Sequence, residues 1–272
     1  MNELEPKEGI EVDLIRHPEK KGETVPTQTP EGEAGAPGPL PKEGIMQTQE
    51  IAQKFAERVK DIPRAVVFGF VSNQPRTGEA SFIFDQELRV MAERLGNSQV
   101  FNQSEKSLEE IAQEVKPETD KVVIMDSTED TAMGMRDWNM DALLAKISEL
   151  GSEPAVLQKW MGDPELQKEL GITPEQIGQE TKDWLKTQRE KAKTLFPDRP
   201  IVITGIGHSF ELDTAIASLM GKEFSDKTLD ELGGDMINTM EGARIVIQPN
   251  GLGTVEYRDM KEELDLSEGR EE

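Results

Sequence analysis

The sequence contains two histidines, and each one ends an apolar run of the kind that forms a buried strand. His17 closes residues 10–17, IEVDLIRH, directly after Arg16, and His208 closes residues 200–208, PIVITGIGH. Arg76 follows a third apolar run, residues 64–72. Because the carboxyl ends of parallel strands form one edge of a sheet, we expect these four side chains to converge there.

Two arginines and two histidines at one edge of a sheet call for an anionic ligand. Asn73 and Pro75 indicate that a helix begins beside Arg76, and a helix N-terminus favours anions through its N–H groups and its dipole. A phosphoryl group is a compact dianion that matches the forked donors of arginine. One histidine at a strand end is more often structural, so the interpretation depends on the conjunction of all four residues.

The elements that would position these residues alternate between strands and helices. Helical patterns cover residues 42–61, 79–96, 173–196 and 209–221, and further apolar runs cover 121–127 and 243–251. The stretch PNGLG then predicts a hairpin into residues 252–259. The alternation predicts an α/β fold with three α/β/α layers and a mostly parallel central sheet.

Three segments depart from that alternation. Residues 20–44 are rich in Pro, Gly, Thr and Glu and predict a flexible loop. Residues 137–172 predict short helices, broken at Gly-Ser, Gly-Asp-Pro and Gly-Ile, that form a helical insertion roofing the sheet edge. Residues 261–272 predict an acidic tail, which leaves residues 1–260 as a single domain.

Composition excludes several classes of function. The formal net charge of −23 opposes binding to nucleic acid or to anionic membranes, and the absence of cysteine excludes disulfides and thiolate nucleophiles. No leader-like segment or apolar stretch of about 20 residues is present, so we expect a soluble, cytoplasmic protein. Its partner would be a small phosphorylated substrate, and the oligomeric state stays open.

Four motifs, in order along the chain, resemble those of the histidine phosphatase superfamily, which includes the phosphoglycerate-mutase-like enzymes. They cover roughly residues 10–80 and 200–250, and several positions differ from the family pattern, such as Pro18 where the family has Gly. The matching positions are Arg16, His17 and Glu19 in LIRHPEK, Gly38, Leu40, Gly44 and Gln47 in GPLPKEGIMQTQEIA, Ser72, Arg76, Thr77 and Glu79 in SNQPRTGEAS, and Gly207 and His208 in IVITGIGHS.

The resemblance implies a phosphomonoester hydrolase that works through a phosphohistidine intermediate. His17 would be the nucleophile, and Arg16, Arg76 and His208 would bind the phosphoryl oxygens and stabilise their charge. The resemblance implies neither a metal nor another cofactor. Glu129 is favoured as the general acid among Asp126, Glu129 and Asp130, and Glu211 is a rival.

Two alternatives remain open at this level. The chain could be a phosphoglycerate or phosphosugar mutase, although the long loop after His17 offers no obvious closure against water. It could instead be a non-catalytic member that binds a phosphorylated ligand or a protein partner. The complete set of Arg16, His17, Arg76 and His208 argues against the non-catalytic alternative.

Overall fold

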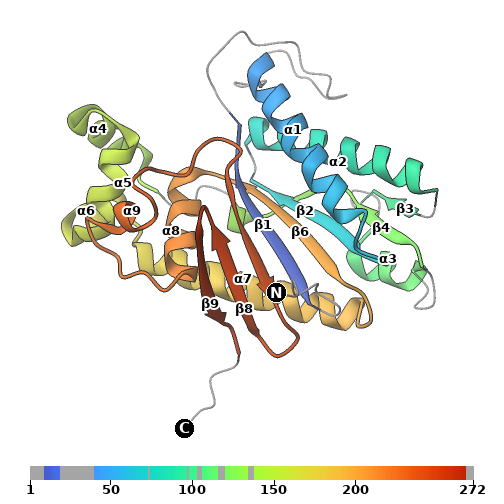
Figure 1. The fold of residues 1–272 in the computed structure, drawn as a ribbon. Coiled ribbons are helices and arrows are strands. Elements are labelled where there is room, and N and C mark those ends of the chain that lie inside the picture. The colour runs from blue at the N-terminus through green and yellow to red at the C-terminus, as the bar shows by residue number, and fades with distance from the viewer. Residues whose placement is uncertain are drawn as a thin grey trace.

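The computed structural model describes residues 9–18, 40–72, 74–96, 98–102, 106–115, 120–133 and 138–267, and these residues build one twisted sheet (Figure 1). Its order is β3-β4-β2-β6-β1-β7-β8-β9, with β5 paired to β2. The strands are β1 (Ile10–Arg16), β2 (Val66–Val71), β3 (Ser98–Phe101), β4 (Val122–Met125), β5 (Thr128–Glu129), β6 (Ile201–Gly207), β7 (Gly242–Ile247), β8 (Leu252–Tyr257) and β9 (Met260–Asp265).

The centre of the sheet is parallel, as the sequence predicted. Strands β3, β4, β2, β6 and β1 pair in parallel, and β7, β8 and β9 extend the sheet as antiparallel neighbours. Every residue of β2, β4 and β6 is buried, because helices cover both faces. That burial explains why these strands appear in the sequence as continuous apolar runs rather than as alternating patterns.

Helices cover the two faces of the sheet and give the three α/β/α layers (Figure 1). On one face, α1 and α2 pack over β2 and β6 through Phe55 and Phe84. On the other face, α3, α7 and α8 pack through residues such as Ile111, Leu185 and Ile216. These helices are α1 (Lys42–Val59), α2 (Pro75–Leu95), α3 (Leu108–Glu114), α7 (Pro174–Leu195) and α8 (Ser209–Leu219).

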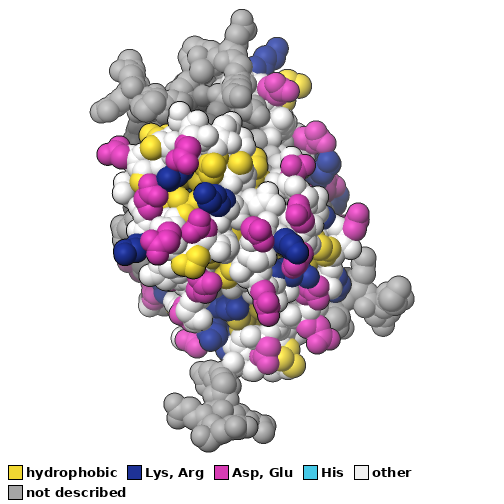
Figure 2. All heavy atoms as spheres, turned by 90° about the vertical axis from the view of Figure 1, so that its left-hand side faces the viewer, with side chains coloured by type: hydrophobic (Ala, Val, Ile, Leu, Met, Phe, Trp, Pro, Cys, Tyr) yellow, Lys and Arg dark blue, Asp and Glu magenta, His cyan; other side chains and the backbone are white. Residues whose placement is uncertain are grey.

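The helical insertion forms a third cluster of its own. It contains α4 (Met140–Leu150), α5 (Glu153–Gly162) and α6 (Pro164–Leu170), separated near Gly151 and Gly162 as the sequence predicted. Trp138, Trp160 and Phe210 join this cluster to the first turn of α8. Figure 2 looks at the molecule from the side where α4, α5 and α6 lie in Figure 1, and carboxylates are spread over that whole face, with lysines and arginines between them.

Two predicted boundaries need correction. Residues 261–265 belong to β9, which pairs with β8 from Met260 to Asp265, whereas the sequence predicted an acidic tail from residue 261. Leu264 and Leu266 are buried there, and their alternation with charged residues is that of an edge strand with one covered face. The predicted loop 20–44 ends earlier, because α1 begins at Lys42, and residues 19–39 lie outside the described part.

Two short strands were not predicted. β3 is a partly exposed edge strand, and β5 holds two residues beside β2. Both are too short to show a periodic pattern in the sequence. Within the described residues, no helix combines the length and the apolar character needed to cross a lipid bilayer.

Candidate active site

The register of the sheet brings the two histidines together. In the parallel pairing of β1 with β6, Arg16 lies opposite Gly207, so His17 and His208 both occupy the next position along their strands. The His17 N–H donates to the Gly207 carbonyl over 3.0 Å, and the two imidazole rings lie 5.0 Å apart at an interplanar angle of 62°. Both histidines are almost fully buried. The predicted convergence of the two histidines is therefore confirmed.

A backbone carbonyl fixes the tautomer of His17. The Nδ1 atom of His17 lies 2.8 Å from the carbonyl oxygen of Pro18. A carbonyl oxygen can only accept, so Nδ1 carries the proton and donates. In the neutral ring, the lone pair then resides on Nε2. This is the protonation that a nucleophilic imidazole requires.

The protonation of His208 is fixed from both sides. The Nη2 group of Arg76 donates to Nδ1 of His208 over 3.0 Å, and Nε2 of His208 lies 3.1 Å from the Ser72 hydroxyl. Because Nδ1 accepts from Arg76, the neutral ring carries its proton on Nε2 and donates to Ser72. The Ser72 hydroxyl in turn donates to Thr77 Oγ1 over 2.8 Å, and Thr77 donates to the backbone carbonyls of Ser72 and Gln74.

Arg76 comes from the first turn of α2, where the sequence predicted a helix start. Pro75 is the first residue of that helix and Gln74 is its N-cap. Burial lowers the pKa of Arg76, the Glu153 carboxylate at the start of α5 counteracts this, and the positive charge of Arg16 adds to the lowering. Glu153 and Arg16 therefore both act electrostatically on Arg76. The sequence around Glu153 is that of an ordinary helix start, so it did not reveal Glu153 as a charged neighbour of Arg76.

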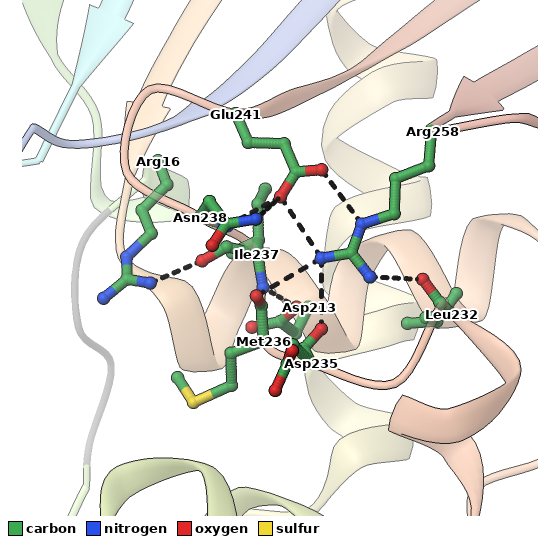
Figure 3. A network of polar contacts seen from close by, with 9 residues as sticks. All are labelled: Arg16, Asp213, Leu232, Asp235, Met236, Ile237, Asn238, Glu241 and Arg258. Atoms are coloured by element: carbon green, nitrogen blue, oxygen red, sulfur yellow. Dashed lines mark hydrogen bonds and ion pairs between the residues drawn. The ribbon is translucent and has the colours of Figure 1, made fainter. Parts of the chain in front are cut away.

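Arg16 ends β1 and points its guanidinium toward a distant loop. Its Nη1 group donates to the carbonyl of Ile237, as Figure 3 shows, while its backbone N–H donates to the Glu241 carbonyl over 2.9 Å. The backbone N–H of Met240 donates to the Arg16 carbonyl over 3.1 Å. The site therefore includes the segment before β7, which the sequence analysis did not connect to it.

Glu129, the favoured acid, occupies the same end of the sheet. In β5 it lies opposite Val71, the residue before Ser72, and its side chain is exposed. The other two carboxylates of that loop are engaged in structural contacts. Asp126 pairs with Arg89, and Asp130 accepts from the backbone of Ala132 and from the indole of Trp184.

The rival acid Glu211 lies in the first turn of α8, whose N-cap is His208. It is buried, and its Oε1 accepts a hydrogen bond of 2.7 Å from the indole of Trp138. The structure therefore leaves two acid candidates in contrasting environments, one exposed at a strand end and the other buried under the helical insertion. The assignment of Glu129 stays a prediction.

The positions that carried the resemblance are spread over the same region. The carboxylate of Glu79, in α2, accepts from the backbone N–H of Leu40, which ties the segment before α1 to the helix that carries Arg76. Glu19 and Gly38 lie outside the described residues. In the part of the chain that the structure describes, no group of three or more His, Asp or Glu side chains is arranged to hold a metal ion.

Comparison with models of protein families finds no match, and comparison with curated protein sequences finds none either. Solved structures with a similar fold include the crystal structure assigned as the phosphohistidine phosphatase SixA from Agrobacterium tumefaciens. It shares 10% identity, with 87% of this chain and 91% of that chain covered and a TM-score of 0.37. A mycobacterial glucosyl-3-phosphoglycerate phosphatase shares 13% identity, with coverages of 86% and 89% and a TM-score of 0.39.

Both of these proteins are members of the histidine phosphatase superfamily, the superfamily that the sequence motifs resemble. At such low identities and scores, the likeness carries no conclusion about chemistry. The site itself consists of two buried histidines and two arginines at the carboxyl edge of a parallel sheet.

Proposed function

We propose that the chain is a phosphoric monoester hydrolase of the histidine phosphatase type, in which His17 carries the phosphoryl group. The observation that carries the proposal is the pair of imidazole rings 5.0 Å apart, with Arg76 bonded to one of them and Arg16 preceding the other. Nucleophile and charge-stabilising groups thereby face one small volume, which suits a compact dianion.

The arginines of the site differ from other partly buried arginines of the chain. Among the described residues, Arg16 and Arg76 make no ion pair with a carboxylate partner, and their guanidinium groups donate instead to neutral acceptors, the Ile237 carbonyl and the His208 ring. An anionic substrate would supply the anionic partner. Carboxylate partners are present, by contrast, for Arg58, Arg89, Arg244 and Arg258.

The proposed first step forms a phosphohistidine. The Nε2 lone pair of His17 attacks phosphorus, a P–N bond forms, and the P–O bond to the leaving alcohol breaks in line with it. The Pro18 carbonyl holds the Nδ1 proton and stabilises the positive ring that forms. A general acid, Glu129 in our assignment, donates its proton to the leaving oxygen.

The second step returns the enzyme to its starting state. Water attacks phosphorus, its proton passes to the carboxylate that acted as acid, and the P–N bond breaks with its electron pair returning to Nε2 of His17. Arg16 and Arg76 bind the nonbridging oxygens in both steps, and His208 holds the Arg76 guanidinium through its Nδ1. Because these side chains supply the positive charge, the proposal needs no metal ion.

A rapid alkaline quench tests the intermediate. A phosphohistidine survives base and decays in acid, so wild-type protein mixed with a ³²P-labelled phosphomonoester should retain label on the peptide that contains His17. His17→Ala should lose both label and turnover, and turnover should persist in EDTA. Label on another residue, or undiminished hydrolysis by His17→Ala, would refute the mechanism. Binding of orthovanadate without any turnover on a broad substrate panel would favour a non-catalytic binding protein.

A further inference from the structure

The loop of residues 232–241, between α9 (Thr228–Glu231) and β7, contacts the end of β1 at three points (Figure 3). The Arg16 guanidinium donates to the Ile237 carbonyl, and two backbone hydrogen bonds join Arg16 to Met240 and Glu241. The position of the Ile237 carbonyl therefore bears on where the Arg16 guanidinium lies.

Two carboxylates fix the peptide groups on either side of the Ile237 α-carbon. The Ile237 N–H donates to Oδ1 of Asp213 over 2.8 Å. The peptide group that contains the Ile237 carbonyl also contains the Asn238 N–H, and this N–H donates to Oε2 of Glu241 over 2.7 Å. One peptide group is thus anchored by a helix residue, Asp213, and the next by Glu241, the residue directly before β7.

Arg258, in the turn between β8 and β9, holds the rest of the loop. It pairs with Glu241 over 2.9 Å, and it donates to the carbonyls of Leu232, Asp235 and Met236. Arg258 therefore orients Glu241 and the first half of the loop. Asp213 binds the Ile237 N–H from α8. Figure 3 shows these contacts arranged around the loop, with Arg16 at one side and Arg258 at the other.

Asp213 is an unusual residue for a purely structural anchor. It is completely buried in α8, its Oδ2 atom has no hydrogen-bond partner among the described residues, and burial raises its pKa to about 7. A buried carboxyl group with an unsatisfied oxygen is destabilising. The same helix carries His208 at its N-cap, so α8 holds one site residue directly and reaches a second through Ile237.

We propose that Asp213 and Glu241 are positioning residues for Arg16, which aim the Ile237 carbonyl so that the guanidinium is held at the mouth of the phosphoryl site. The proposal rests on the proposed function only in assigning phosphoryl binding to Arg16. Neither carboxylate is proposed to touch substrate. The two carboxylates hold the peptide groups on either side of Ile237, and the Ile237 carbonyl in turn holds the Arg16 guanidinium.

The first measurement uses the free protein and needs no ligand. The ¹⁵N signals of the Arg16 guanidinium, assigned by their absence in Arg16→Lys, report how fast the group rotates. Rotation should be restricted in the wild-type protein and fast in Asp213→Ala. Asp213→Asn, whose side-chain oxygen can still accept from Ile237, should keep the rotation restricted.

Thr228→Ala is the matched control. Thr228 is also completely buried, and its hydroxyl accepts the Ser225 N–H over 2.8 Å, the same length as the bond from Ile237 to Asp213. Thr228→Ala should lower the free energy of unfolding and leave the Arg16 signals unchanged. If Asp213→Ala does not fold, Glu241→Ala provides the same test.

The second measurement is a double-mutant cycle on orthovanadate binding by calorimetry. Asp213→Ala should weaken binding about tenfold, in line with the loss of one hydrogen bond to a charged group. The loss should disappear in an Arg16→Ala background, because the two residues act as one unit. Thr228→Ala should leave affinity unchanged in both backgrounds.

The outcomes separate the positioning proposal from the proposed function. Restricted Arg16 rotation in both Asp213→Ala and Glu241→Ala would overturn the positioning proposal, as would additive losses in the cycle. Failure of the wild-type protein to bind orthovanadate would refute the proposed function instead. The rotation measurement would then decide the positioning proposal alone.

Discussion

Ser72 takes no part in the proposed chemical steps, yet its hydroxyl orients the residues around it. It closes β2, and its hydroxyl accepts the Nε2 proton of His208, so that Nδ1 is left to accept from Arg76. It also donates to Thr77 in the first turn of α2. One hydroxyl therefore links a strand end, the histidine of β6 and the helix that carries Arg76.

Ser72→Ala should reduce phosphatase turnover about fivefold, because one hydrogen bond that orients a buried ring contributes about 1 kcal/mol. His208 would lose the acceptor that selects its tautomer. The matched control is Ser81→Ala in α2, which removes a buried hydroxyl bonded to the Gly78 carbonyl over 3.0 Å. Steady-state kinetics on both variants give the comparison, and equal losses would show that Ser72 has only a packing role.

The two candidate acids can be separated by the leaving group. An acid matters most for an alkyl phosphate and least for p-nitrophenyl phosphate, whose phenolate leaves without a proton. Glu129→Gln should slow hydrolysis of an alkyl phosphate about 100-fold and leave p-nitrophenyl phosphate nearly unaffected. The same selectivity in Glu211→Gln, with Glu129→Gln active on both substrates, would move the role to Glu211.

At the scale of single residues, the sequence could predict that His17, His208 and Arg76 lie at the ends of strands, because each comes at or after the end of an apolar run. Ser72 was visible only as part of a motif. Asp213 gave no signal, because its partner Ile237 is brought to it by the path of the loop before β7. Contacts of this kind depend on topology and not on spacing in the sequence.

Among the elements, the helical insertion contacts the helix after His208 through the indole of Trp138. Trp138 packs against Trp160 and Phe210, and its N–H donates to the buried carboxylate of Glu211. The insertion is thereby coupled to the first turn of α8, directly after His208. The predicted insertion is thus a packed cluster that contacts α8, and its role as a roof over the sheet edge stays a prediction.

Trp138→Phe should lower the free energy of unfolding by about 1–3 kcal/mol, because it removes a hydrogen bond to a buried carboxylate. Trp160→Phe is the matched control, since the Trp160 indole donates to a neutral acceptor, the Ile172 carbonyl, over 3.0 Å and is likewise buried. Trp160→Phe should lower the free energy of unfolding by less than Trp138→Phe does. Urea denaturation of both variants measures the difference, and a larger loss in Trp160→Phe would contradict the account.

Fully buried central strands were predictable, and edge strands such as β3 and β9 were not. The runs that became β2, β4 and β6 are mainly apolar because both faces are covered, and this gives a signal without any partner information. β9 was missed because an edge strand with one covered face contains mainly charged residues. Its burial is set by β8, which no local pattern reveals.

For the whole molecule, buried carboxyl groups and net charge act on stability in the same direction. Burial raises the pKa of Asp13 to about 6 and the pKa values of Asp85 and Asp213 to about 7, from the ordinary aspartate value of 3.8. A raised folded-state pKa stabilises the protein below the unfolded value, and this contribution is lost as the pH rises through the folded value. The window therefore runs from about pH 4 to about pH 7, and the net charge of −23 at pH 7 adds self-repulsion.

The Tm should therefore fall between pH 5 and pH 8, by at least about 3 °C if 1 kcal/mol of this stabilisation is lost. Calorimetry with and without 0.5 M NaCl separates the two causes, because salt screens surface repulsion but acts little on buried groups. Asp85→Asn should reduce the dependence of Tm on pH that remains in 0.5 M NaCl. A Tm that rises over this range in high salt would show that these carboxyl groups are ionised in the folded protein without penalty.

The position of β1 has a consequence for how the protein is made. β1 ends at Arg16, directly before His17, yet both of its neighbours in the sheet, β6 and β7, lie more than 180 residues later along the chain (β1 Ile10–Arg16, β6 Ile201–Gly207). During synthesis, this strand stays unpaired until β6 or β7 has emerged. Closing so long a loop is slow compared with local contacts. Recovery of anion binding during refolding should therefore lag behind the formation of helix, and the competence of the site would mark the last long-range closure of the chain.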